Sequence, residues 1–386
     1  WKQPNQTVQA SKIWHELKQT DSAFTCAKMF WWYNMYADVD WSATPRPMYP
    51  ADGSKHFDIY CWPFEMRPQL KGQFGEFPFP TFWGPMAGQQ SPAGKPEAVS
   101  EWIANSAKWI EEKEQPTLNL VYLPHLDYDM QRLGPEHPEI NHDLQRIDRI
   151  VGELIGLFED RGVQVVLLSE YGITPANRPI HLNRLFREQG WLNIKEEIGL
   201  ERLDCGNSKA FAVADHQIAH VYVNDASVEA KVRKLLEATP GVASVWGTAE
   251  KQAKGIDHQR AGDLIVTSEE DAWFTYYYWM DDRLAPDFAR CVDIHRKPGY
   301  DPVELFKDPA RGSMPRVMFK LLKKKLGFRM LMDVIPLDAN LVKGSHGCRP
   351  TDRADWPVLL SATDVLPSGD ALKSTDVHDV ILRAVS

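Results

Sequence analysis

The feature that most limits the fold is the regular alternation of short apolar runs and amphipathic segments from residue 97 onward. Apolar residues at helical spacing predict helices over 97–114 and 144–158, with an apolar run at 117–124 between them. A strand–helix–strand order of this kind predicts an α/β fold with a mainly parallel sheet flanked by helices on both faces. The same patterns predict further strands over 163–170, 219–223, 262–268 and 358–362, and further helices over 10–19, 181–189 and 228–238.

The first 95 residues differ from the rest because they are rich in Pro, Gly and aromatic residues. They predict long ordered loops, which usually wrap a scaffold or wall a pocket. We therefore expect one domain over residues 1–386, with a loop-rich aromatic cap or insertion at 1–95 and an α/β core with inserted segments at 96–386. A second aromatic run, AWFTYYYWMDD at 272–282, is more typical of a core strand than of a wall for a base or lipid chain.

Composition limits the class of partner and the compartment. The formal net charge of −9 argues against a nucleic-acid polymer or an anionic membrane surface as the main partner. No apolar run approaches the ~20 residues that a membrane-spanning helix needs. The five cysteines are odd in number and widely spaced, which is typical of reduced, cytoplasmic usage rather than of a disulfide framework. The sequence gives no indication of the oligomeric state.

The stretch VQVVLLSEYGITP at 163–175 predicts a strand with polar side chains at its carboxyl end. Its apolar run is typical of a buried parallel strand, and it stops at Ser169 and Glu170 before a turn at Gly172. In such sheets, sites form beyond the carboxyl ends of the strands. Similar polar clusters lie at or near other predicted strand ends, at residues 124–129 (PHLDYD), 215–220 (DHQIAH) and 343–347 (KGSHG).

Together these clusters offer carboxylate and imidazole groups, which are the ligands that zinc and similar borderline metals take in proteins. Taken singly, a His at a strand end is more often a hydrogen-bonded structural residue, and an Asp in a loop is more often a turn former. The sequence has no P-loop, no GxGxxG after a strand, no GxSxG elbow and no HExxH. These absences exclude the common nucleotide-fold, α/β-hydrolase and zincin interpretations.

The order of the motifs resembles the alkaline-phosphatase superfamily, and within it the type I phosphodiesterase/nucleotide pyrophosphatase branch. That branch has a P-D-x-x-G-H-x-x-G-P segment, then S-D-H-G-M and then a late H-G. The corresponding segments here are LDYDMQRLGP at 126–135, SEYGI at 169–173 and His346-Gly347, and PIHLNRLFREQGWL at 179–192 is also similar. The likeness spans roughly residues 117 to 362. It implies an alkaline-phosphatase-like fold and a metal-dependent hydrolase of small phosphate esters, either phosphodiesters or pyrophosphates.

The resemblance also implies two divalent ions, most commonly zinc. By motif, one ion would be held by Asp127, the Gln131 position and His346. The other would be held by Glu170 and Tyr171, together with an Asp upstream of the sequence. Two-metal sites activate the nucleophile and stabilise the leaving oxygen.

Three of these positions depart from the family pattern. Gln131 and Tyr171 stand where the family has His, and Glu170 stands where it has Asp. The departures indicate an altered metal site, for which His216 is the first candidate substitute ligand and His125 the second. They equally motivate a different class of function, namely a catalytically inactive member of the superfamily that binds a ligand or a partner.

The family's nucleophile, a Thr or Ser, would lie upstream of Trp1. We therefore expect the sequence to lack the N-terminal strand and the nucleophile segment, and to be inactive on its own. Thr44 is a poor candidate because its Pro-rich surroundings predict a loop. Lys297 and His295 are candidate anion-binding residues, although the same segment is equally typical of a solvated turn.

Overall fold

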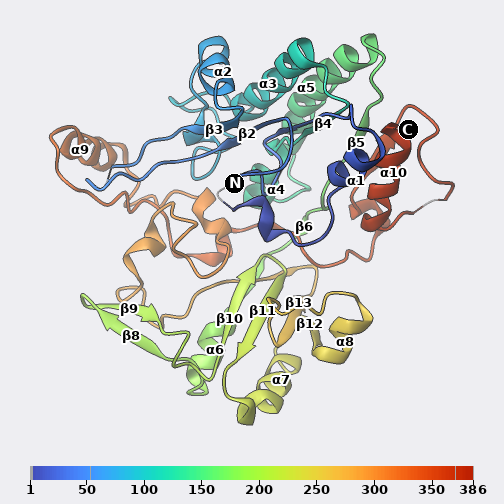
Figure 1. The fold of residues 1–386 in the computed structure, drawn as a ribbon. Coiled ribbons are helices and arrows are strands. Elements are labelled where there is room, and N and C mark those ends of the chain that lie inside the picture. The colour runs from blue at the N-terminus through green and yellow to red at the C-terminus, as the bar shows by residue number, and fades with distance from the viewer. Residues whose placement is uncertain (1–2, 53, 370, 386) are drawn as a thin grey trace.

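The chain contains two four-stranded sheets that lie one above the other in the view of Figure 1. The structure is a computed structural model that describes residues 3–52, 54–369 and 371–385. The upper sheet carries helices on both faces, and the lower sheet packs against further helices. The predicted α/β class is therefore confirmed.

The upper sheet is mixed and has the strand order β3-β2-β1-β4. Its strands are β1 (Cys26–Met29), β2 (Trp41–Pro45), β3 (Ile59–Trp62) and β4 (Leu118–Val121). Strand β1 pairs in parallel with both β2 and β4, whereas β3 pairs antiparallel with β2. The carboxyl ends of β1, β2 and β4 therefore meet at one edge of the sheet, which is where sites form in such folds.

Side chains alternate between the two faces of this sheet, as the pleat of a strand requires. Cys26 packs with the helices of one face, and its neighbour Ala27 packs with those of the other. The face of Cys26 is covered by α1 (Ile13–Thr20) and α10 (Val377–Val385). The face of Ala27 is covered by α2 (Met66–Phe74), α3 (Ala98–Glu114) and α5 (Ile140–Asp160).

The lower sheet is antiparallel throughout, so the prediction of a mainly parallel sheet fails for the strands at 219–223 and 262–268. In the upper sheet two of the three strand pairings are parallel. Its strand order is β10-β11-β13-β12. Strands β10 and β11 are joined by a two-residue turn, and a connection this short permits only antiparallel pairing. The strands are β10 (Ala210–Asp215), β11 (Ile218–Val223), β12 (Val242–Trp246) and β13 (Leu264–Ser268), and the helices beside them are α6 (Leu182–Glu188), α7 (Glu229–Glu237) and α8 (Thr248–Ala253).

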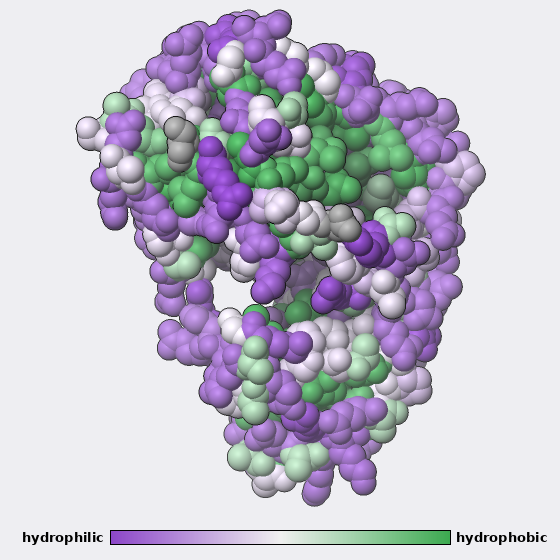
Figure 2. Space-filling view, turned by 90° about the vertical axis from the view of Figure 1, so that its right-hand side faces the viewer, coloured by the Kyte–Doolittle hydropathy of each residue, from purple (hydrophilic) through white to green (hydrophobic). Residues whose placement is uncertain are grey.

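Strand β5 (Val166–Leu168) forms at the predicted place but is not the buried parallel strand that its apolar run predicts. It pairs antiparallel with β16 (Leu359–Ser361) in a separate two-stranded sheet, and its residues are only half-buried. A strand with one neighbour keeps part of its surface exposed. Figure 2 views the side of the molecule that carries α1, α10 and β5 and shows apolar residues gathered on the upper part of it.

The first 95 residues are rich in loops, as predicted, but they are more than a cap, because they supply β1, β2, β3 and α2 to the upper part of the fold. These strands are four or five residues long, which is too short for a clear period of two in a sequence this rich in aromatics and Pro. The second aromatic run is core, as predicted. It begins with strand β14 (Ala272–Phe274), and Trp273, Tyr276 and Trp279 have no exposed surface.

The remaining elements are short connections, apart from two helices. The helices are α4 (His125–Leu133) and α9 (Met314–Lys325), and the strands are β6 (Thr174–Pro175), β7 (Arg178–Ile180), β8 (Ile194–Glu197), β9 (Leu200–Leu203) and β15 (Gly344–Ser345). None of the helices in the described part of the chain combines the length and apolar character that crossing a bilayer requires. The five cysteines are all free thiols.

Lys28, in the middle of β1, leads to a prediction about stability. Its side chain has no exposed surface, its ammonium lies 4.5 Å from the ring centroid of Trp14, and burial lowers its pKa from 10.5 to about 8. Between these two pH values the unfolded chain binds a proton that the folded chain has released, so stability rises with pH. We expect Lys28→Met to abolish this rise and to add roughly 3 kcal/mol at most to the free energy of unfolding at pH 7, at about 1.4 kcal/mol for each pKa unit.

Urea unfolding of both proteins between pH 7 and pH 10.5 would measure the effect. The matched control is Lys231→Met, because Lys231 lies exposed on α7 and its replacement should leave the pH profile unchanged. A Lys28→Met variant with the same pH profile as the wild type would contradict the prediction.

Candidate active site

Asp127 is the residue around which the predicted site residues gather. It lies in the first turn of α4, directly beyond the carboxyl end of β4, where a carboxylate is favoured by the helix dipole. Its Oδ1 accepts hydrogen bonds from the Tyr171 hydroxyl at 2.9 Å and from the Gln131 amide at 2.8 Å. Burial raises the pKa of Asp127, and the charge of His216 partly opposes this. Three segments of the chain therefore meet at this carboxylate.

His346 lies next to Asp127 because β15 is held tightly against α4 and β6. Strand β15 pairs with β6, and a Cβ added to Gly344 would lie 2.2 Å from the carbonyl oxygen of Met130. Only glycine permits this approach. The Nε2 atom of His346 lies 4.0 Å from Oδ1 of Asp127, and its ring stacks on that of Tyr171 with the centroids 3.5 Å apart.

His216 reaches the same place from the turn between β10 and β11. The residue adopts φ +56°, and its ring centroid lies 3.8 Å from that of His346. The backbone N–H of Gln217 donates to the carbonyl of His346 at 2.9 Å, which fixes the turn against that loop. Nδ1 of His216 lies 2.6 Å from Oδ1 of Asp215. Burial opposes ionisation of Asp215, but its hydrogen bond with His216 and the charge of that ring lower its pKa overall.

Tyr300 completes the cluster, and the sequence analysis did not identify it. Its ring stacks on His216 with the centroids 3.8 Å apart, and its hydroxyl donates to Oε1 of Gln131 at 3.3 Å. Gly299 places it, because a Cβ there would lie 2.7 Å from the carbonyl oxygen of Ala214. The sequence signal that was available is the glycine directly before this tyrosine, which permits a close backbone approach.

Two imidazole nitrogens in the cluster have no hydrogen-bond partner. Nε2 of His216 and Nε2 of His346 are both buried without one. Burial, and then the charge of His216, lower the pKa of His346 to about 2, so its imidazole is neutral. A neutral imidazole nitrogen is the form that binds a metal, and a carboxylate on the other ring nitrogen, as Asp215 provides for His216, is the usual support of such a ligand.

Asp127, His216 and His346 have the chemical groups that bind a divalent ion, but their side chains are not arranged around a common point. A carboxylate and two imidazole nitrogens are ligands that zinc or a similar metal takes. Among the described residues, however, no three or more His, Cys, Asp or Glu side chains converge as a metal site. Oδ1 of Asp127 is instead engaged by Tyr171 and Gln131. Burial and the charge of Asp127 raise the pKa of Tyr171, so its phenol stays protonated and acts as a donor.

Glu170 and His125, the other two candidate ligands, lie in different surroundings. Glu170 is exposed at the rim, where partial burial and the charge of Asp127 raise its pKa. His125 points away from the cluster, because its Nε2 lies 3.2 Å from Oδ1 of Asp143 on α5. It precedes Asp127 by two positions in α4, and residues two apart on a helix face different directions. The structure therefore does not place His125 as a substitute ligand.

The predicted anion-binding residues do not form a site together. Lys297 is completely buried, and its ammonium lies 2.6 Å from Asp301 and 2.7 Å from Glu304. Two carboxylates neutralise its charge, so Lys297 does not offer a free cation to an anion. His295 is exposed two residues earlier in the chain.

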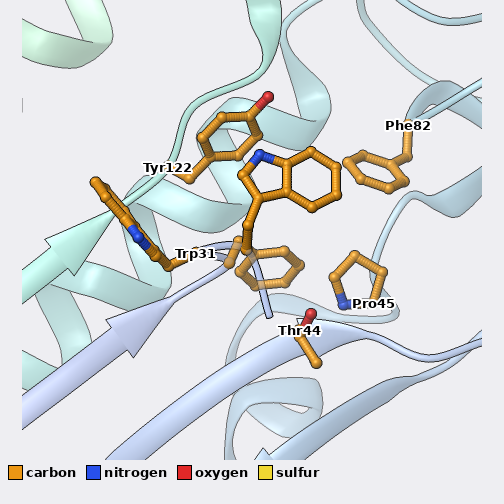
Figure 3. A pocket seen from close by; sticks show the side chains of 7 residues that line it. Trp31, Thr44, Pro45, Phe82 and Tyr122 are labelled. Carbon is orange, nitrogen blue, oxygen red and sulfur yellow. The ribbon is translucent and has the colours of Figure 1, made fainter. Parts of the chain in front are cut away.

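A small cavity of about 10 Å³ lies at the carboxyl ends of β1 and β2, beside the cluster. Figure 3 shows the rings of Trp31, Phe82 and Tyr122 around it, with Thr44 at its edge. The hydroxyl of Thr44 is buried without a hydrogen-bond partner. Tyr122 lines the cavity, and burial together with the charges of Asp127 and Glu170 raises its pKa.

A larger open groove of about 860 Å³ begins directly after His346. Gly347, Cys348 and Arg349 form one wall, and residues of β12 and β13 form the other, among them Trp246. Figure 2 shows that the molecule is hollowed between its upper and lower parts. The groove therefore opens at Gly347, the residue directly after His346.

Residues 1–301 match the sequence model of the type I phosphodiesterase / nucleotide pyrophosphatase family. The chain belongs to this family. The resemblance identified from the motifs at Asp127, Glu170 and His346 is thus confirmed at the level of the family. An uncharacterized pyrophosphatase/phosphodiesterase of Schizosaccharomyces pombe is 36% identical over 98 residues, which are 24% of this chain and 19% of that relative.

Two solved structures are similar to this member of the phosphodiesterase family, to different degrees. Phosphonoacetate hydrolase from Sinorhizobium meliloti 1021, in complex with phosphonoformate, is 13% identical and matches with a TM-score of 0.53 over 99% of this chain and 76% of that one. Murine ectonucleotide pyrophosphatase / phosphodiesterase 5 is 15% identical, with a TM-score of 0.40 over 69% of this chain and 56% of that one. The first likeness shows that this chain shares the fold of that hydrolase.

Proposed function

We propose that the protein is a hydrolase of phosphate esters, either phosphodiesters or pyrophosphates, that depends on a divalent metal ion at an altered site. One observation carries the proposal. Nε2 of His216 and Nε2 of His346 are both buried without hydrogen-bond partners. His346 lies 4.0 Å from the carboxylate of Asp127, and the ring of His216 lies 3.8 Å from that of His346. Asp127 and His346 belong to motifs of the family. His216 belongs to none of them, and we propose that it supplies a nitrogen ligand in a chain where Gln131 and Tyr171 replace two of the family's histidines.

Each residue of the cluster has a distinct proposed role. Asp127, His346 and His216 would hold one ion, and zinc suits this set of ligands. When bound, a divalent ion stabilises the negative charge that develops on the phosphoryl group. Asp215 fixes the orientation of His216 through Nδ1, and Gln131 and Tyr171 orient the carboxylate of Asp127.

The family's second ion has less support in this chain. Its expected ligands are Glu170, which lies exposed at the rim, and Tyr171, which donates its proton to Asp127. We therefore propose one ion rather than two. We leave Thr44 out of the reaction because its hydroxyl is buried beside the aromatic cavity. The groove after His346 is the proposed place for the part of the ester that leaves.

Metal content tests this proposal. We expect the wild-type protein to hold about one equivalent of a divalent metal after dialysis, and His346→Ala and His216→Ala to lose it, because each removes one nitrogen ligand. Elemental analysis of the purified proteins is the measurement. The matched control is His378→Ala, because His378 lies exposed on α10 and pairs with Glu16 instead. Metal-free wild type, or equal metal in all four proteins, would contradict the proposed site.

A catalytically inactive binding protein is the second candidate function, and one observation favours it. Tyr171 and Gln131 satisfy the carboxylate of Asp127 internally, in positions where the family has metal-binding histidines. Turnover of bis(p-nitrophenyl) phosphate with added zinc separates the two candidates. A binding protein would take up the ester without releasing nitrophenol.

A further inference from the structure

Helix α9 differs from the other long helices because it packs so little against the rest of the molecule. None of its twelve residues is buried, and it lies at the edge of the structure, away from both sheets (Figure 1). It is held mainly through Val317, which contacts the lower core, and through Lys320, which pairs with Asp333. Its opposite face is therefore left without cover from the described residues.

That uncovered face is apolar. Met314, Met318, Leu322 and Leu326 recur every four residues and so form one stripe along the helix. Their exposed fractions are 61%, 58%, 52% and 64%, and Phe319 beside them is 61% exposed. Single exposed apolar residues are ordinary on a protein surface, but a contiguous row of large ones marks an interaction site.

The same segment is strongly basic in a chain whose net charge is −9. Residues 309–332 contain no Asp or Glu. Their basic residues are Arg311, Arg316, Lys320, Lys323, Lys324, Lys325 and Arg329. Only the first three of these pair with Asp333. The last turn of the helix therefore carries three lysines, Lys323, Lys324 and Lys325, and the ammonium of Lys323 lies 6.0 Å from the ring of Phe319 at one border of the apolar stripe.

We propose that α9 and the residues after it, up to Leu331, dock the protein onto an anionic lipid surface. A helix with a wide apolar face and lysines beside it lies in the plane of a bilayer interface, with its apolar side chains below the headgroups. The long lysine side chains reach back to the lipid phosphates. The proposal is independent of the reaction at Asp127, and it concerns where the enzyme works rather than what it cleaves.

Charge argues against a second copy of the chain as the partner that covers the apolar face of α9. Two copies that met through α9 would bring two basic segments together, and the like charges would repel at close range. A bilayer that contains phosphatidylserine supplies the opposite charge and an apolar interior at the same time. An acidic protein would satisfy the lysines but would also need a groove wide enough for five large apolar side chains.

Flotation with vesicles tests the proposal. We expect the wild-type protein to float with vesicles that contain 30% phosphatidylserine and to stay behind with pure phosphatidylcholine. The variant Lys323→Gln/Lys324→Gln/Lys325→Gln should lower the partition coefficient roughly a hundredfold, since each lysine near an anionic surface is worth about fivefold. Phe319→Ser/Leu322→Ser should abolish flotation, because it removes the side chains that enter the interface.

The controls distinguish binding through α9 from nonspecific hydrophobic binding and from misfolding of the variants. Ile198→Ser removes another apolar side chain, 98% exposed at the turn of the β8–β9 hairpin, and should float like the wild type. The variants replace only side chains that are not buried, and their thermal unfolding should match the wild type. Wild type that stays behind with both vesicles, or that floats equally with both, would overturn the proposal. So would a dimer in sedimentation equilibrium that both variants dissociate.

Discussion

Replacing Asp127 by Asn is expected to lower kcat/KM for a phosphodiester at least about a thousandfold, since it removes the carboxylate that lies 4.0 Å from Nε2 of His346 in the proposed ligand set. Removing a single group that stabilises developing charge already costs about 10² to 10³ in rate. Loss of the metal would add to this. Asn keeps the shape of Asp, and its carbonyl can still accept from Tyr171 and Gln131, whose bonds to Asp127 are 2.9 and 2.8 Å. The fold should therefore survive.

The measurement is the steady-state hydrolysis of bis(p-nitrophenyl) phosphate by the full-length protein, with thermal unfolding beside it. Asp148→Asn is the matched control, because Asp148 is exposed on α5 and its substitution makes the same chemical change outside the site. A variant Asp127→Asn that keeps more than a tenth of the wild-type activity would contradict the assignment. An inactive variant that also unfolds earlier would show a structural role for Asp127 instead.

The sequence predicted individual elements better than their pairing. The run at 163–168 indicated a strand, and a strand forms there, but its partner is β16 rather than a central parallel strand. Pairing depends on the length and course of the connections, which periodicity does not show. The two-residue turn at His216 and Gln217 was a signal for antiparallel pairing. The sequence analysis did not use it, because it identified the strand after DHQ but not the apolar run AFAVA at 210–214 before it.

In the candidate site, likewise, the sequence predicted which motif residues meet but not how the residues outside the motifs are oriented. Asp127, Tyr171 and His346 belong to motifs in a fixed order, so their meeting was predictable from the resemblance. His125 and His216 were ranked by closeness in sequence alone. The side that each faces depends on helix phase for the first and on a turn at φ +56° for the second. Tyr300 belongs to no motif and reaches the site through a backbone contact with β10.

The net charge of the whole chain does not show how its charges are distributed. Summed over the chain, −9 argued against an anionic surface as the main partner. The sum conceals the basic segment 309–332, because acidic residues elsewhere outnumber its lysines and arginines. Whether such a segment is neutralised depends on what lies beside it in space. In the structure, Asp333 neutralises part of it and leaves the last turn of α9 basic.

Lys297→Met is expected to lower the free energy of unfolding by about 3–5 kcal/mol at pH 7, the usual cost of removing one partner from a buried ion pair. Lys297 lies between Asp301 and Glu304, and none of the three side chains is more than 1% exposed. Burial alone would lower the pKa of Lys297, but the two carboxylates outweigh it and raise that pKa. Without the ammonium, two negative charges would remain close together in an apolar environment.

The pH dependence distinguishes this cause from lost packing. Burial already raises the pKa of Glu304, and removal of Lys297 should raise it further. The folded variant then binds a proton at a higher pH than the unfolded chain, so its stability should improve as the pH falls from 7 to 5. Urea unfolding at both pH values measures this, with Lys231→Met as the exposed control. A deficit that is the same at both pH values would indicate packing alone.

The triple variant Lys297→Met/Asp301→Asn/Glu304→Gln extends the test to the site. It removes all the charges of the cluster together, and such replacements are often close to neutral in stability. We expect it to recover most of the loss at pH 7. Tyr300 lies between Lys297 and Glu304 in sequence and stacks on His216, so the cluster fixes the loop that closes one side of the site. Recovered stability with recovered turnover would show that the buried charges serve to hold this loop, whereas recovered stability without turnover would show that their geometry also positions Tyr300.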